Sequence, residues 1–190
     1  EDRIMNTKTF NERLAELEKT QKDFWNVSRA TGNFLNMLVK MTNSKRVLEI
    51  GTSNGYSGLW FLSALEQTNG HLTTIEFYDK RQSIARKNYD ECGFEGRYTA
   101  LLGSASEILK NLEDDEKFDL VFIDACKKEY VDYFNIIKPH LTNNAIITAD
   151  NITSHREKVQ TFLDAVYGDE DFQTEILDLP AGLSVSYKLK

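Results

Sequence analysis

The sequence lacks the features that would divide it into several units or tie it to a membrane. It has no proline-rich or serine-rich linker, no internal repeat and no low-complexity segment, so we expect residues 1–190 to form a single domain. No apolar run approaches the roughly 18 residues that a membrane-spanning helix needs. The polar start from Glu1 to Lys8 also lacks the apolar core of a secretory signal. These absences predict a cytoplasmic protein without a membrane partner.

Cysteine is scarce, and negative charge outweighs positive charge. The two cysteines, Cys92 and Cys126, do not have the spacing of a metal knuckle or a redox motif, so we expect two reduced thiols. The chain has 30 Asp and Glu against 23 Lys and Arg, a formal net charge of -7. Because nucleic-acid affinity depends on cationic contacts with phosphates, this balance argues against a DNA-binding protein and disfavours tRNA. The densest cationic stretch, from Lys80 to Lys87, is interpreted as the solvated face of a helix.

Residues 1–43 predict a helical preface to the rest of the domain. The first expected helix ends near Trp25 and carries an apolar stripe with helical spacing. That stripe consists of Phe10, Leu14, Leu17 and Gln21. A second helix is expected from Ser28 to Met41. Its apolar side consists of Phe34, Leu35, Leu38 and Met41.

From Lys45 onward, short apolar runs alternate with amphipathic stretches. The runs predict buried parallel strands at Arg46–Ile50, Leu72–Glu76, Tyr98–Leu102, Leu120–Ile123 and Ala145–Ala149. The stretches predict helices at Tyr56–Gln67, Asp79–Cys92, Ala105–Leu112, Tyr130–Leu141 and His155–Tyr167. Such alternation is typical of a parallel sheet that crossover helices cover on both faces.

Two further apolar runs, Phe172–Asp178 and Leu183–Leu189, follow near the C-terminus. The Leu-Pro-Ala-Gly connection between them is too short for a parallel crossover, so they should form an antiparallel hairpin at the sheet edge. Residues 44–190 are therefore predicted to form an α/β core of the Rossmann-like type. Its sheet should have seven strands, mostly parallel, with the antiparallel hairpin last and helices on both faces.

The first predicted strand leads into a glycine-bearing turn, at the end of the sheet where ligands bind in such folds. Gly51, Gly55 and Gly58 do not match the Gly-x-Gly-x-x-Gly dinucleotide fingerprint, and the Gly-Lys-Ser/Thr of a P-loop is missing. Glu49, two positions before the turn, suits a ligand with a cationic end, such as a methionine amino group. The alternative is an ordinary strand-to-helix turn without a ligand.

The next two strands end in residues suited to a nucleoside. Glu76 ends the second strand, about 25 positions after the first turn, where a carboxylate can accept hydrogen bonds from both ribose hydroxyls. Gly103, Ser104 and Ala105 follow the third strand, and such small residues leave room for an adenine ring beside the backbone. Together with the glycine turn, these strand ends favour a nucleoside-containing cofactor.

The fourth and fifth strands end in oxygen-bearing side chains. Asp124 follows the fourth strand, with Lys127 one turn away, and Asp150 and Asn151 follow the fifth. Adjacent strands would bring the two carboxylates and the amide to one rim, and such oxygen ligands suit a hard cation, especially Mg²⁺. Mn²⁺ and Ca²⁺ are also compatible, because oxygen ligands discriminate weakly among these ions. The alternative is that both aspartates merely cap the helices that follow.

Val47–Ser57, Glu76, Phe118–Tyr130 and Asp150-Asn151 resemble the corresponding motifs of the cation-dependent O-methyltransferases. That family includes catechol O-methyltransferase, the plant caffeoyl-CoA enzymes and small bacterial relatives. The similarity extends from about Val27 to the C-terminus. It implies a class I methyltransferase fold, S-adenosyl-L-methionine and a divalent cation as cofactors, a small hydroxylated aromatic substrate of catechol type, and a homodimer.

The resemblance also implies roles for individual residues. Lys127 would be the general base, taking a proton as the substrate oxygen attacks the sulfonium methyl group in line, and Asp124 would share in catalysis. The implied metal ligands are Asp124, Asp150 and Asn151. The implied cofactor-binding residues are Val27, Glu49, Gly51, Ser53, Gly55, Ser57, Glu76, Phe77, Gly103, Ser104, Ala105 and Asp124.

Several positions depart from the family pattern. Cys126 stands where many bacterial relatives have Asp and the catechol enzyme has Trp, which leaves the substrate pocket unspecified. Asn143-Asn144 replaces a glycine pair, although Asn tolerates the positive φ of such a turn. The long insertion of the plant enzymes is missing, which suggests a more open pocket. His155 is interpreted as an ordinary helix-start residue, with a second base as the alternative.

Three other functions remain as alternatives at this point. One is methylation of a hydroxylated tRNA base, which the acidic balance disfavours. Another is a cofactor-binding protein without chemistry, which has no need of Asp124, Lys127, Asp150 and Asn151. The third is a nucleotide-dependent dehydrogenase, which the glycine spacing disfavours.

Overall fold

The computed structural model describes residues 7–190. Residues 1–6, which carry most of the polar start used above to argue against a secretory signal, lie outside the described part. The helices are α1 (Thr7–Lys19), α2 (Gln21–Phe24), α3 (Arg29–Thr42), α4 (Tyr56–Thr68), α5 (Asp79–Glu91), α6 (Ala105–Lys110), α7 (Tyr130–Ile137) and α8 (Arg156–Gly168), with 3₁₀ turns η1 (Lys127–Glu129) and η2 (Lys138–His140). The strands are β1 (Arg46–Ile50), β2 (His71–Glu76), β3 (Tyr98–Leu102), β4 (Phe118–Ile123), β5 (Leu141–Ala149), β6 (Phe172–Leu177) and β7 (Leu183–Lys188). Within this part, no helix is long and apolar enough to cross a membrane.

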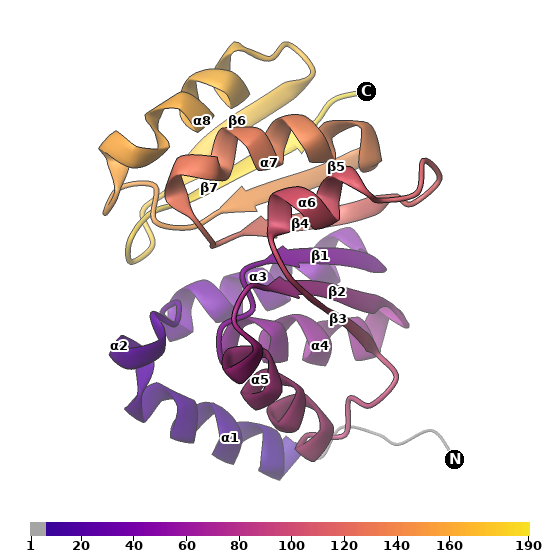
Figure 1. Ribbon diagram of the computed structural model, residues 1–190, viewed down its shortest axis with the longest axis vertical. Coiled ribbons are helices and arrows are strands. Elements are labelled where there is room, and N and C mark those ends of the chain that lie inside the picture. Colours follow the sequence, from indigo (N-terminus) through magenta and orange to yellow (C-terminus); the bar gives the residue numbers. More distant parts are fainter. Residues whose placement is uncertain (1–6) are drawn as a thin grey trace.

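The seven strands form one sheet in the order β3-β2-β1-β4-β5-β7-β6 (Figure 1). Neighbours from β3 to β5 are parallel, whereas β7 runs antiparallel to both β5 and β6. The predicted Rossmann-like fold, with its C-terminal antiparallel hairpin, is confirmed. The strand order reverses between β1 and β4, which is where such sheets open a crevice for ligands.

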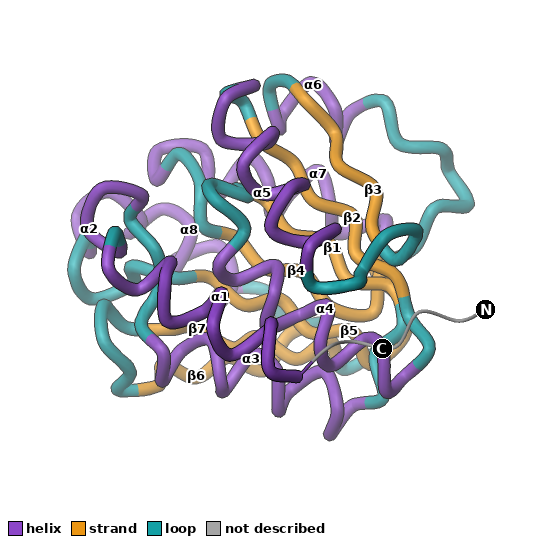
Figure 2. Tube along the Cα trace, turned by 90° about the horizontal axis from the view of Figure 1, so that it is seen from below, coloured by secondary structure: helices purple, strands orange, loops and turns teal. Residues whose placement is uncertain are grey.

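Successive residues of each central strand point to opposite faces of the sheet, and each face has its own core. Val47, Leu72 and Leu120 pack with α1, α3, α4 and α5, whereas Leu48 and Val121 pack with α6, α7 and α8. The near-continuous apolar strand sequences follow from this double burial. The two views in Figures 1 and 2 show the same division of the helices between the two sides of the sheet.

The N-terminal helices α1 and α3 pack against α4. Nearly every residue of α4 is buried, because the sheet lies on one side of this helix and α3 on the other. The amide of Asn36 on α3 donates to the Trp60 carbonyl at 2.8 Å and to Ser63 Oγ at 2.7 Å, which fixes the two helices together. Ser28 caps α3 by accepting a hydrogen bond from the Thr31 N–H.

Some predicted boundaries were wrong, for local reasons. The first helix was expected to run unbroken to Trp25, but the chain turns at Thr20 between α1 and α2. The helix expected at 130–141 ends at Ile137 as an α-helix, because Pro139 has no N–H to continue it. Met41, expected on the apolar side of its helix, is 64% exposed.

The strand expected at 145–149 begins earlier, at Leu141. Its pairing with β4 shifts register between Phe118 and Leu120, and Asn144 lies in this irregular stretch with φ of 63°. An Asn side chain allows this left-handed conformation, as predicted for the residue pair that replaces two glycines.

Candidate active site

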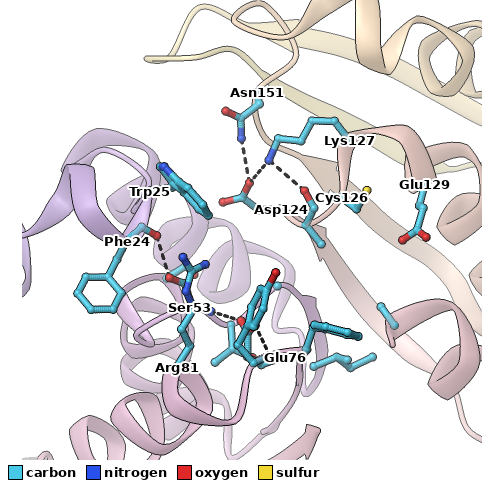
Figure 3. A pocket seen from close by; sticks show the side chains of 18 of the residues that line it. Phe24, Trp25, Ser53, Glu76, Arg81, Asp124, Cys126, Lys127, Glu129 and Asn151 are labelled. Carbon is cyan, nitrogen blue, oxygen red and sulfur yellow. Dashed lines mark hydrogen bonds and ion pairs between the residues drawn. The ribbon is translucent and has the colours of Figure 1, made fainter. Parts of the chain in front are cut away.

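A cavity of about 610 Å³ opens beyond the carboxyl ends of β1, β2 and β4. Its walls come from the ends of the five parallel strands, β1 to β5, and from the short segment of residues 24–27 at the junction of α2 and α3 (Figure 3). The predicted site residues on its walls are Val27, Gly51, Ser53, Ser57, Glu76, Phe77, Gly103, Ser104, Ala105, Asp124, Lys127 and Asn151. The helix-start residue His155 also lines it. Sequence positions spread over more than a hundred residues are thus brought to one cavity.

Gly51, just after the tip of β1, lies against the backbone just after the tip of β4. Its φ is +103°, and a Cβ built there would meet the Asp124 carbonyl oxygen at 2.2 Å. The neighbouring strands are held in register by a hydrogen bond from the Asp124 N–H to the Ile50 carbonyl at 2.9 Å. Only glycine satisfies both the backbone angle and the contact.

We expect Gly51→Ala to lower the free energy of unfolding by about 3 kcal/mol or more, because it combines a strained φ with an overpacked backbone contact. Gly96→Ala is the matched control, since Gly96 has φ of +80° but no atom within 4 Å of its Cβ position. That variant should lose only about 1 kcal/mol. Urea unfolding of both variants measures the difference. Equal losses would show that the contact with Asp124 does not constrain the strand tips.

Glu76 joins the glycine turn to the end of β2. Its Oε2 accepts the Ser53 N–H at 2.7 Å, and its Oε1 accepts the Tyr78 N–H at 2.9 Å. These bonds fix both carboxylate oxygens while leaving lone pairs on each. Ser53 Oγ in turn donates to the Phe24 carbonyl at 2.8 Å, which ties the segment of residues 24–27 to the same turn.

Glu49 lies behind the cavity wall, fully buried. Its carboxylate accepts hydrogen bonds from Ser57 Oγ at 2.5 Å and Thr74 Oγ1 at 2.6 Å. Burial raises the pKa of Glu49 to about 8, despite these two hydrogen bonds. Ser57 lines the cavity, so it is the link between Glu49 and any ligand there.

The raised pKa of Glu49 predicts that the free energy of unfolding depends on pH. Between its ordinary pKa of 4.5 and its folded pKa of about 8, the folded state binds the proton more tightly than the unfolded state. The free energy of unfolding should therefore fall as pH rises through this window, by up to about 1.4 kcal/mol per pH unit. Glu49→Gln removes this contribution, so the variant should gain stability over the wild type from pH 5 to pH 9. Urea unfolding at several pH values tests this, and a constant difference would contradict it.

Gly55 also lies behind the wall, with φ of +88°, at the start of α4. A Cβ there would meet the Tyr89 ring at 2.8 Å and Ala85 at 3.0 Å, so this glycine lets α4 approach α5. Its contact with a cofactor stays a prediction, as do the cofactor contacts of all the other residues.

Asp124, Lys127, Asp150 and Asn151 form one cluster at the tips of β4 and β5. The parallel register that pairs Ile123 with Ala149 places Asp124 beside Asp150. Lys127 Nζ donates to Asp124 Oδ1 at 2.9 Å, and Asn151 Nδ2 donates to the same oxygen at 2.8 Å and to Asp150 Oδ2 at 3.2 Å. Figure 3 shows Asn151 and Lys127 converging on the Asp124 carboxylate. The residues predicted to meet at these two strand ends therefore do meet.

Asp150 is the least satisfied member of this cluster. It lies behind the cavity wall, 4% exposed, and its Oδ1 has no hydrogen-bond partner among the described residues. Burial and the neighbouring Asp124 carboxylate raise its pKa well above the usual range. A buried carboxylate in this state calls for a positive charge.

The sequence did not reveal an aromatic and cationic wall at the cavity mouth. Trp25 is 73% exposed, and the guanidinium of Arg81 lies over its ring. The Arg81 Cζ is 4.6 Å from the centroid of the Trp25 ring and 5.4 Å from the centroid of the Tyr78 ring. Arg81 belongs to the cationic stretch that was interpreted as solvated, and it is the member that turns inward to the cavity. The position of Arg81 in the sequence does not indicate this contact, because only the fold brings Trp25 near it.

Comparison with known proteins gives consistent results. Residues 5–166 match a family model described as O-methyltransferase. A catechol O-methyltransferase of Niastella koreensis is 37% identical over 128 residues, which cover 66% of this chain and 58% of that protein. The chain spans about half the length of the curated relatives it matches.

Two solved structures share the fold over nearly all of both chains. A provisionally named O-methyltransferase from Klebsiella pneumoniae has a TM-score of 0.87 at 25% identity, over 98% of this chain and 92% of its own. A provisionally named caffeoyl-CoA O-methyltransferase from Staphylococcus aureus has a TM-score of 0.82 at 28% identity, over 92% and 91%. With the family match covering most of its length, the chain belongs to the O-methyltransferase family.

Proposed function

We propose that this chain transfers a methyl group from S-adenosyl-L-methionine to a hydroxyl of a small aromatic acceptor with vicinal hydroxyls, assisted by a divalent cation. One observation carries the proposal. Asp124, Lys127, Asp150 and Asn151 converge at the tips of β4 and β5, beside a cavity that the adjacent Gly51 turn and Glu76 also line. Family membership and the likeness to a catechol O-methyltransferase support it.

The cofactor would lie along the strand ends. Glu76, already held by two backbone amides, has lone pairs left for the ribose hydroxyls. Gly103 has φ of +146° and only the Ile108 side chain near its Cβ position, so the backbone there can approach an adenine ring closely. The half of the cavity near Gly51 would take the methionine end, with Ser57 connecting it to the buried Glu49.

The residues at the cluster fit a divalent cation. Asp124, Asp150 and the Asn151 amide offer oxygen donors, and Mg²⁺ is the ion that such a set favours first. Asp150 Oδ1 lacks a partner in the described structure, and Lys127 is the one cationic side chain of residues 7–190 within ion-pair distance of the two adjacent carboxylates, so a second positive charge is favoured. Asn151 would present its Oδ1 after a half-turn of the amide. No three His, Cys, Asp or Glu side chains of residues 7–190 form a metal-binding group, so the amide is needed to complete the set.

Each residue then has a task in the transfer. When bound, the cation supplies charge that favours ionisation of the acceptor hydroxyl and fixes its position. Lys127 Nζ lies at the cavity wall, 2.9 Å from Asp124 Oδ1, and as a neutral amine with a free lone pair it would take the hydroxyl proton and become the ammonium. Asp124 orients the lysine through their ion pair. The segment of residues 24–27, which includes Trp25, helps to shield the reacting atoms from water.

A methyl-transfer assay tests the proposal. With labelled S-adenosylmethionine, 4-methylcatechol should be methylated, while 4-methylphenol, which lacks the second hydroxyl, should react far more slowly. Bulk tRNA isolated from cells, which keeps its hydroxylated bases, serves as the probe of the alternative acceptor. S-adenosylhomocysteine should bind and NAD should not. Binding of NAD alone, or methylation of tRNA but not of the diphenol, would contradict the proposal.

A further inference from the structure

A buried hydroxyl reaches the cluster of Asp124, Lys127, Asp150 and Asn151, and the proposed mechanism does not use it. It belongs to Tyr130, the first residue of α7, which is fully buried. The hydroxyl donates a hydrogen bond to the Asp150 carbonyl at 3.3 Å. Burial, and then the carboxylates of Asp124 and Asp150, raise the pKa of Tyr130 well above its ordinary value, so the hydroxyl keeps its proton and stays a donor.

The carbonyl that Tyr130 holds belongs to the peptide between Asp150 and Asn151. The Asp150 N–H, on the other side of the same residue, donates to the Ile123 carbonyl at 3.0 Å. The end of β4 therefore fixes one side of the Asp150 backbone, and Tyr130 fixes the other. Because β5 ends at Ala149, the bond from Tyr130 extends the hold on the chain beyond the end of the strand.

The orientation of this peptide affects where the Asn151 side chain points. Asn151 has φ of 64°, a left-handed conformation that residues with a side chain adopt at a cost in free energy. From this conformation its amide donates to Asp124 Oδ1 at 2.8 Å and to Asp150 Oδ2 at 3.2 Å. Such a backbone conformation persists where the surrounding structure holds it in place. The hydrogen bond from Tyr130 is one of the contacts that hold it.

The ring of Tyr130 is itself fixed and reaches the lysine of the cluster. Phe162 on α8 packs edge-on against it, with ring centroids 5.8 Å apart. Lys127 Nζ lies 5.6 Å from the centroid of the same ring. Tyr130 thus contacts the Asp150–Asn151 peptide through its hydroxyl and Lys127 through its ring. One substitution can separate the two contacts, because phenylalanine keeps the ring and lacks the hydroxyl.

We propose that Tyr130 is a positioning residue for the metal site, whose hydroxyl holds the Asp150–Asn151 peptide so that both side chains stay directed at the cation. The inference rests on the proposed function, since it concerns the cation of that reaction. Tyr130 is not among the residues that line the cavity, so it acts through the two ligands and takes no part in the proton transfer. Groups that orient metal ligands in this way typically change metal affinity by about 10–100-fold when they are removed.

Tyr130→Phe tests the role of the hydroxyl. With S-adenosylhomocysteine bound, electron paramagnetic resonance should show that the variant binds Mn²⁺ about tenfold more weakly than the wild type. The Mg²⁺ concentration for half-maximal methylation of 4-methylcatechol should rise in parallel, while kcat at saturating Mg²⁺ stays within about threefold. A role in folding alone would lower kcat or stability and leave Mn²⁺ affinity unchanged. Circular dichroism and S-adenosylhomocysteine affinity check that the variant is folded.

Tyr133→Phe is the matched control. Tyr133 lies one turn further along α7, is 2% exposed, and donates its hydroxyl hydrogen bond to Glu129 rather than to the cluster. Its substitution should leave Mn²⁺ affinity unchanged. If Tyr130→Phe binds Mn²⁺ as tightly as the wild type, or if Tyr133→Phe weakens binding equally, the inference is wrong and the proposed function stands. If the wild type binds no Mn²⁺ and methylates its acceptor in a chelator, the metal assistance in the proposed function is wrong as well.

Discussion

Lys127→Met is expected to lower kcat for methylation of a vicinal diphenol by at least about 100-fold, the lower range of what a general base contributes. The expected cause is local. Lys127 Nζ is held at 2.9 Å from Asp124 Oδ1 and 3.2 Å from the Ala125 carbonyl, at the wall of the cavity. Methionine fills similar space without a group that can take a proton. Affinity for S-adenosylhomocysteine, measured by calorimetry, should stay within about twofold.

Lys128→Met is the control for this result. Lys128 is the next residue of η1, exposed, and it does not line the cavity. It removes the same charge from the same turn, so its kcat should stay near the wild-type value. If Lys127→Met kept normal turnover, Lys127 would not be the group that takes the hydroxyl proton, and the proposed role would be wrong.

Asp150→Asn is expected to have the second large effect, again a loss of at least about 100-fold in kcat/KM. Several kcal/mol of transition-state stabilisation is assigned to the metal, and each 1.4 kcal/mol is worth tenfold in rate. The substitution removes one of two carboxylates from the proposed ligand set and keeps the shape of the side chain. The concentration of Mg²⁺ needed for half-maximal rate should rise in parallel.

The same substitution, Asp150→Asn, should not lower the free energy of unfolding, although it lowers activity. Asp150 is buried beside Asp124, and its raised pKa shows that the folded protein holds the ionised form at a cost. Without added metal, the neutral Asn at 150 should be at least as stable as the wild type above neutral pH. Asp132→Asn, on the exposed face of α7, is the control and should change neither property. A large loss of stability in Asp150→Asn, together with normal Mg²⁺ dependence, would indicate a structural role for this carboxylate.

Much of the fold was predictable because burial on both faces of a parallel sheet leaves a clear pattern. The run around Val121 is wholly apolar and those around Val47 and Leu72 are largely so, and the structure buries them between two layers of helices. The errors fall where a local feature overrides periodicity. Thr20 interrupts a helical stripe that continues in the sequence, and Pro139 ends α7 before the apolar pattern ends.

The site was predictable to the extent that it lies at strand ends. Register alone brings Asp124 to Asp150, because parallel strands finish at the same edge. Trp25 and Arg81 were missed because their contact joins two helical segments far apart in the sequence, and neither residue type signals a ligand.

The most direct test of the central claim is the metal dependence of methyl transfer to 4-methylcatechol, with S-adenosylhomocysteine affinity measured in parallel. After treatment with a chelator, the rate should fall at least about 100-fold and return when Mg²⁺ is added in excess, while cofactor affinity stays nearly constant. A rate that is unchanged in the chelator would contradict the account, because Asp124, Asp150 and Asn151 would then have gathered at the strand tips for some purpose other than holding a cation.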